Sequence, residues 1–140
     1  GAQLLFAYGE ATVPKITINL RKSYGGSHIV MGCKQLRADL NFAWPTAEIA
    51  VMGASGAVAV LCGKEAKKIK EEGGDVKAFL AEKEDEYTEA FANPYQAAQF
   101  GYIDDVIEPR NTRFRICRGL AQLAHKRQNL PAKKHGCMPM

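Results

Sequence analysis

The chain has 140 residues, of which 46% are hydrophobic, so it is long and apolar enough to bury a core as one compact unit. Its apolar runs are far shorter than the ~20 residues that a membrane-spanning helix needs, and its first residues lack the features of a secretory signal. We therefore expect a soluble, cytoplasmic protein with no segment inserted in a membrane.

The net charge is +4, and residues 111–140 carry seven Lys and Arg but no Asp or Glu. Such a basic tail raises the question of nucleic-acid binding. Within it, however, apolar residues recur at helical spacing, which predicts an amphipathic helix packed on a core with its basic residues in solvent or facing acidic or phosphate groups. These apolar residues are Phe114, Cys117, Leu120, Ala121 and Ala124. A nucleic-acid partner is not expected.

The four cysteines at positions 33, 62, 117 and 137 are scattered, without a C-x-x-C motif. This spacing favours reduced, packed thiols over a disulfide framework or a zinc site. We expect no metal in this chain, and we expect His125 and His135 to be surface residues.

The first residues of the chain lack the capping residues that mark the start of a helix. The elements predicted in the first half of the chain are, in order, the end of a helix at 4–11, a strand at 13–20, a turn at 21–26, a helical turn at 27–33, a loop with aromatic anchors at 39–45 and a strand at 47–52. The last of these is apolar enough to be buried on both faces.

The second half is mainly helical. Its predicted elements are, in order, a helix at 57–69, a charged helix at 76–91, a short helix at 94–100, a strand at 102–107 and the basic helix at 112–127. Ser55 would cap the first helix, and Asn93 and Pro94 would begin the third. The expected buried stripe of the charged helix is Val76, Phe79, Leu80, Tyr87 and Phe91.

Strands that alternate with helices predict an α/β fold with parallel pairing. Three strands make a thin sheet, so we expect further strands from upstream sequence or from a neighbouring chain.

The most informative motif is the turn Tyr24-Gly25-Gly26-Ser27-His28. A glycine pair between a strand and a helical turn lets consecutive backbone N–H groups point outward, where the helix dipole helps them bind an oxyanion. Such a pair can also be only a tight connection. The same ambiguity holds for residues 53–56, where Gly56 would serve only close helix packing.

Side chains for acid–base catalysis are not evident. His28 adjoins the candidate donors, but the sequence does not fix its direction, and Asp39 and Glu48 are isolated acids. Asp104 and Asp105 alternate across a strand and therefore cannot share a face. A site of backbone donors fits chemistry in which the substrate or a cofactor moves the proton.

Six blocks of the sequence resemble the carboxyltransferase (β) subunits of biotin-dependent acyl-CoA carboxylases, a family that includes the propionyl-CoA carboxylase β and methylmalonyl-CoA decarboxylase subunits. The Ala-Trp-Pro-Thr-Ala run at 43–47 is the most specific part. The blocks are residues 10–15, 21–27, 38–53, 91–95, 101–109 and 133–136. The resemblance implies a partial domain of the crotonase/ClpP-like fold, a ββα spiral. It identifies residues 1–130 as the C-terminal part of the carboxyltransferase C domain and residues 131–140 as a tail.

The resemblance also implies a function: the biotin-binding half of a site that moves a carboxyl group between carboxybiotin and an acyl-CoA, with propionyl-CoA favoured. Tyr24, Gly25, Gly26 and Ser27 would bind biotin, and the Gly26 and Ser27 amides would be catalytic by stabilising the ureido oxygen. The family pattern Gly-Gly-Ala-Tyr is Gly-Gly-Ser-His here, which keeps the backbone donors. Ile29 would line the acyl pocket.

The implied partners are acyl-CoA, a biotin carboxyl carrier with its biotin carboxylase subunit, and further copies of the subunit in a hexamer. Biotin would be carried on the partner. Three alternatives stay open: the carboxyltransferase of a sodium-pumping decarboxylase of methylmalonyl-CoA or glutaconyl-CoA, a non-catalytic assembly fragment, and a crotonase-type hydratase.

Overall fold

The computed structural model describes residues 1–132, which form short strands and a larger number of helices. The strands are β1 (Ile16–Asn19), β2 (Lys22–Tyr24), β3 (Leu40–Ala43), β4 (Glu48–Ala50) and β5 (Asp105–Val106). The helices are α1 (Ala2–Glu10), α2 (Gly25–Val30), α3 (Ala54–Leu61), α4 (Gly63–Glu71), α5 (Val76–Phe91), α6 (Pro94–Gln99) and α7 (Thr112–Gln122), with 3-10 turns η1 (Lys34–Leu36) and η2 (Pro109–Asn111). The tail beyond residue 132, including the block at 133–136, His135 and Cys137, lies outside the described residues.

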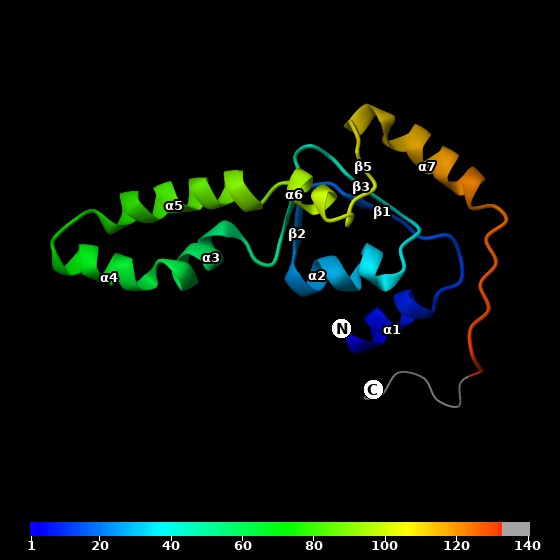
Figure 1. The fold of residues 1–140 in the computed structure, drawn as a ribbon, viewed down its shortest axis with the longest axis horizontal. Coiled ribbons are helices and arrows are strands. Elements are labelled where there is room, and N and C mark those ends of the chain that lie inside the picture. The colour runs from blue at the N-terminus through cyan, green and yellow to red at the C-terminus, as the bar shows by residue number, and fades with distance from the viewer. Residues whose placement is uncertain (133–140) are drawn as a thin grey trace.

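The strands form two separate parallel sheets, one with the order β1-β3-β5 and one with β2-β4 (Figure 1). Ile16 of β1 is in register with Leu40 of β3, and Lys22 of β2 with Glu48 of β4. Two successive strands therefore enter different sheets before a helix returns the chain, first as β1-β2-α2 and then as β3-β4-α3. This repeat is the ββα spiral, and the predicted α/β class with parallel pairing is confirmed.

Two strands were missed by the sequence pattern. β2 lies where a turn was expected, because three residues are too few to show an alternation. β3 lies where a loop was expected, because its centre is Asn41, a polar residue that is 0% exposed. The Asn41 Oδ1 accepts a hydrogen bond from Asn19 Nδ2 at 3.0 Å, whereas Asn41 Nδ2 is buried without a partner among the described residues. The predicted strand at 47–52 is shorter and only partly buried, as β4.

The helices α3, α4 and α5 form an arm that projects from the sheets (Figure 1). The single helix predicted at 57–69 is two helices that meet at Cys62, and the N-cap is Gly53 rather than Ser55. The bounds of α5 agree with the prediction, and its N-cap Asp75 accepts hydrogen bonds from two backbone amides. None of its predicted stripe is fully buried, and Phe91 is 58% exposed.

Helix α7 packs on the β1-β3-β5 sheet through a different face from the one predicted. A Cβ at Gly119 would lie 2.7 Å from Leu40 Cδ1 and 3.1 Å from Ile16 Cδ1, so this glycine marks the closest approach. On the other side, Phe114 is 62% and Leu120 48% exposed. The helix also ends at Gln122, before the predicted residue 127.

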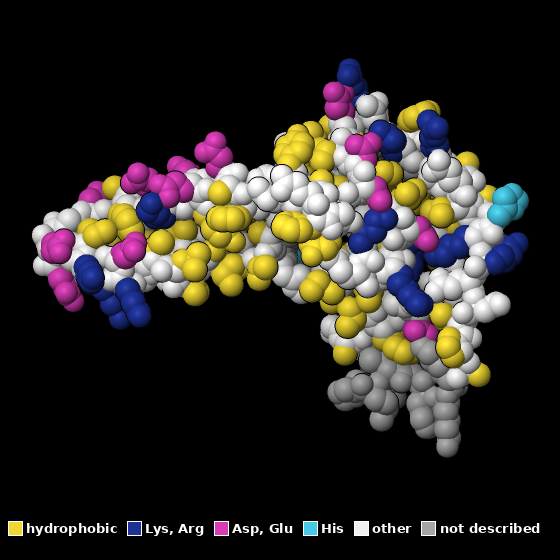
Figure 2. Space-filling view, in the orientation of Figure 1, with side chains coloured by type: hydrophobic (Ala, Val, Ile, Leu, Met, Phe, Trp, Pro, Cys, Tyr) yellow, Lys and Arg dark blue, Asp and Glu magenta, His cyan; other side chains and the backbone are white. Residues whose placement is uncertain are grey.

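The buried core is small and rich in alanine, and it lies between the sheets and α6. Its cluster consists of Ala43, Ala47, Ala97 and Ile103. Large apolar side chains remain on the surface of the arm and at its junction with the sheets (Figure 2). Of the cysteines in residues 1–132, Cys33 is buried as expected, but Cys117 is exposed, and all are free. No helix in this part of the chain combines the length and apolar character that crossing a membrane requires.

Candidate functional site

The turn between β2 and α2 has a conformation that requires glycine at its first position. Tyr24 is extended, with φ −115° and ψ 137°, and Gly25 then reverses to φ +49°. A Cβ at Gly25 would stand 2.7 Å from the carbonyl oxygen of Val51, which follows the paired strand β4. Both the backbone conformation and the close approach of the neighbouring chain therefore exclude a side chain at this position.

Gly26 and Ser27 stand at the open side of the same turn. A Cβ at Gly26 would meet nothing within 4 Å, and both residues are exposed. Within residues 1–132, no oxygen accepts a hydrogen bond from either amide, as is usual for the first N–H groups of a helix. The Ser27 hydroxyl bonds back to the carbonyl oxygen of Tyr24 at 2.6 Å, which fixes the turn. The two predicted donors are thus available to a ligand.

The turn lies between two hollows. The smaller, with a volume of about 380 Å³, is an open hollow lined by α2, β4, α6 and the end of α5, and we call it the α2 pocket. It is lined by Gly25, His28, Ile29, Gln35, Ile49, Ala50, Val51, Phe91, Gln96, Ala97, Phe100 and Tyr102. The larger, of about 760 Å³, follows β1 and includes Ser27 and Met31 in its wall. Ile29, predicted to line an acyl pocket, is 48% exposed in the wall of the α2 pocket.

His28 is held beside the turn by a neighbour that the sequence did not identify. Its Nδ1 lies 2.9 Å from the hydroxyl oxygen of Ser23 on β2. Burial lowers the pKa of His28 below its ordinary value of 6.5. The ring is therefore neutral at pH 7 and in contact with the α2 pocket.

The side chain of Tyr24 contacts β4 and does not line the α2 pocket. Its hydroxyl donates a hydrogen bond to Glu48, and this bond raises the pKa of Tyr24 to about 12. Its ring also covers the next strand–helix turn, since a Cβ at Gly53 would lie 3.3 Å from Tyr24 Cε2. Tyr24 thus shapes the site through its backbone and by connecting the two turns.

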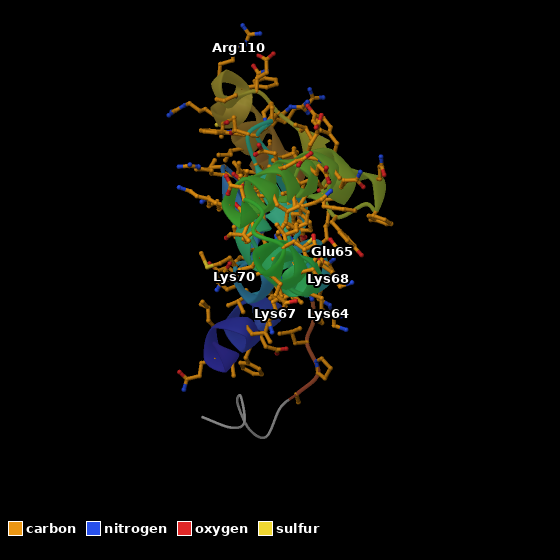
Figure 3. The ribbon with its side chains drawn as sticks, turned by 90° about the vertical axis from the view of Figure 1, so that its left-hand side faces the viewer. Lys64, Glu65, Lys67, Lys68, Lys70 and Arg110 are labelled. Atoms are coloured by element: carbon orange, nitrogen blue, oxygen red, sulfur yellow. The ribbon has the colours of Figure 1, made fainter. Side chains whose placement is uncertain are left out.

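A group of four lysines lies away from this turn, on α4. Lys64, Lys67, Lys68 and Lys70 are exposed around that helix, and Arg110 lies well apart from them (Figure 3). None of these four lysines forms an ion pair with another described residue. Nor do three or more His, Cys, Asp or Glu side chains gather anywhere in residues 1–132 in a way that could hold a metal ion.

A sequence model of the carboxyl transferase domain matches residues 1–138. The chain belongs to this family. It is 53% identical over 140 residues to the propionyl-CoA carboxylase beta chain of Saccharopolyspora erythraea. It is 54% identical over 140 residues to the methylmalonyl-CoA decarboxylase subunit alpha of Propionigenium modestum. Each alignment covers 100% of this chain and 26% of the relative, so the chain spans about a quarter of the length of these proteins.

Solved members of the carboxyl transferase family share the fold described above. The transcarboxylase 12S subunit, a hexamer solved with methylmalonyl-coenzyme A and methylmalonic acid bound, superposes with a TM-score of 0.85 at 53% identity. That match covers 98% of this chain and 26% of the 12S chain. The beta subunit of geranyl-CoA carboxylase from P. aeruginosa gives a TM-score of 0.67 at 26% identity over 96% of this chain. The ββα spiral is therefore that of a partial carboxyltransferase domain.

Proposed function

We propose that this chain supplies the biotin-side half of a carboxyltransferase site, in which a carboxyl group moves between biotin and an acyl-CoA. The observation that carries this proposal is the open pair of amides at Gly26 and Ser27, which no described residue occupies. Preorganised backbone donors of this kind stabilise negative charge that develops on an oxygen.

The residues present fit a ureido group. The missing side chain at Gly26 leaves open space above the two amides, whereas Gly25 is closed by Val51. When bound, biotin supplies the nitrogen that carries the carboxyl group and exchanges the proton of the thioester. The chain's own contribution is to hold the ureido oxygen at the Gly26 and Ser27 amides and to keep the turn rigid through the Ser27 hydroxyl. A side-chain base is not required of this chain.

The α2 pocket suits the acyl part of the thioester. Its wall beside the turn is formed by Ile29 together with Ile49 and Val51, so a small apolar acyl group would be removed from water there. Removal from water strengthens the electrostatic effect of the nearby amides. We assign Ile29 to the acyl pocket on this basis, and propionyl-CoA is the favoured substrate because the relatives include a propionyl-CoA carboxylase beta chain.

The reverse reaction is the second candidate. The relatives include a methylmalonyl-CoA decarboxylase subunit at the same level of identity, and the same residues would serve transfer in either direction.

The large apolar side chains left exposed on the arm favour assembly with further copies and with a biotin carrier. A hexamer, as in the transcarboxylase 12S subunit, is the expected form.

The test is Gly26→Val in the complete subunit that carries this chain, assayed for transfer between methylmalonyl-CoA and free biotin. The Cβ of the new side chain would lie in open space, with no protein atom within 4 Å, so we expect the fold to persist and kcat to fall at least ~100-fold as the side chain blocks access to the amides. Gly63→Val is the matched control, because Gly63 is equally open but lies on α4. Full activity in Gly26→Val would disprove the role of the amides.

A further inference from the structure

His28 is a polar side chain of the α2 pocket that the proposed reaction has not yet used. It projects from α2 between Ser27, one of the two amide donors, and Ile29, which lines the pocket. The hydrogen bond between His28 Nδ1 and Ser23 Oγ, at 2.9 Å, ties the ring to β2. The imidazole is therefore held in position rather than free to rotate.

The other ring nitrogen is available. Among residues 1–132, Nε2 of His28 has no hydrogen-bond partner, and it is not among the side-chain atoms that are buried without one. Solvent, or a ligand in its place, therefore reaches Nε2.

The charge of the surroundings restricts what this nitrogen can bind. No Asp, Glu, Lys or Arg lines the α2 pocket, and the remaining polar residues there are Gln35, Gln96 and Tyr102. Since burial is the cause of the lowered pKa of His28, no nearby carboxylate holds the ring protonated. A carboxylate that enters such a pocket must accept hydrogen bonds, because an unpaired buried charge is strongly unfavourable.

We propose that His28 recognises the carboxylate of the carboxylated acyl thioester, with Nε2–H as the donor. A carboxylate only accepts hydrogen bonds, so Nε2 must carry the proton and Nδ1 must accept one. The Ser23 hydroxyl, 2.9 Å from Nδ1, donates that hydrogen bond in this tautomer. Ser23 is thus a positioning residue, and His28 is a specificity residue that distinguishes a malonyl-type thioester from its uncarboxylated counterpart. This inference rests on the proposed function.

The test compares the binding of methylmalonyl-CoA and propionyl-CoA by calorimetry, without biotin, in the complete subunit. His28→Phe keeps a flat ring but removes the donor, so we expect the Kd for methylmalonyl-CoA to rise roughly 10- to 100-fold. The Kd for propionyl-CoA should not change, because it has no carboxylate to lose. Gln places an amide N–H near the position of Nε2, so His28→Gln should recover most of the binding. Ser23→Ala should also raise the Kd for methylmalonyl-CoA, but by less than His28→Phe does.

The matched control is His125→Phe, because His125 is exposed and does not line the α2 pocket. Equal weakening of both thioesters by His28→Phe, or no weakening of either, would overturn the role of His28. In both cases wild-type transfer to biotin would leave the proposed function standing. If the wild-type subunit transfers no carboxyl group and binds neither thioester, the proposed function itself fails.

Discussion

Two turns in this chain lead from the β2-β4 sheet into a helix, and both contain two glycines, yet their surroundings differ. At the first, Gly25 is closed by the carbonyl of Val51 while Gly26 faces open space. At the second, the ring of Tyr24 covers Gly53, and Gly56 lies near the sulfur of Met52. The two turns contact each other because β2 and β4 are paired. Of the two, only the first has a glycine with open space around it, Gly26, beside backbone amides that no described residue binds.

A glycine pair between a strand and a helix is therefore not by itself a sufficient sign of an anion site. Both turns offer the first N–H groups of a helix, which favour negative charge. What separates them is the side chain that a neighbouring element lays over the turn. Substitutions of the individual glycines should therefore change the stability of the protein by different amounts, which tests this difference between the two turns.

The largest effect on stability is expected at Gly25. Alanine there would have to adopt φ +49° and would place its Cβ 2.7 Å from Val51 O, so we expect Gly25→Ala to lower the free energy of unfolding by roughly 2–4 kcal/mol. Gly26→Ala is the matched control and should change it little, because the added methyl group meets nothing within 4 Å. Urea unfolding followed by circular dichroism measures both. Equal losses in the two variants would mean that the turn is not asymmetric.

That asymmetry was only partly predictable from sequence. The turn at 24–28 and its exposed donors follow from the position of two glycines between a strand and a helical turn. The closing contacts do not, because Val51 and Tyr24 come together only through the pairing of β2 with β4. The Ser23–His28 and Tyr24–Glu48 hydrogen bonds depend on the same pairing and on the start of α2. Local pattern therefore located the candidate turn but not the residues that shape it.

The fold shows the same limit. The bounds of α5 were predictable because its ends carry local signals, including the capping side chain of Asp75. The face of α7 was not, because hydrophobic periodicity gives no weight to glycine, and Gly119 is the residue that meets the sheet. The periodic apolar face instead lies in solvent, with Phe114 62% exposed.

Tyr24→Phe tests the bridge between the two turns and should have an intermediate effect. It removes the hydrogen bond to Glu48 but keeps the ring over Gly53. We therefore expect the free energy of unfolding to fall by at most about 1 kcal/mol, because solvent screens this partly exposed pair. Because the pKa of Tyr24 is raised from 10.0 to about 12, this stabilisation is complete below pH 10 and disappears as the pH rises toward 12. The difference in unfolding free energy between wild type and variant should shrink over that range.

The control for Tyr24→Phe is Tyr95→Phe, since Tyr95 is 57% exposed and its hydroxyl has no partner among the described residues. Its difference from wild type should be small, because the exposed Tyr95 hydroxyl has no hydrogen bond to lose. A pH-independent difference for Tyr24→Phe would show that the bond to Glu48 does not stabilise the fold.

The smallest effect, and one of opposite sign, is expected at Gly56. This residue lies inside α3, and a Cβ there would make an ordinary contact, 3.7 Å from the flexible Met52 side chain. Gly56→Ala should therefore raise the free energy of unfolding by about 0.5–1 kcal/mol, because alanine loses less conformational entropy in a helix. A loss of stability would mean that α3 packs more closely at Gly56 than this contact indicates. If Gly56→Ala leaves carboxyl transfer in the complete subunit unchanged, the turn at residues 53–56 has only a structural role. A loss of transfer without a loss of stability would instead indicate that this turn also binds a ligand.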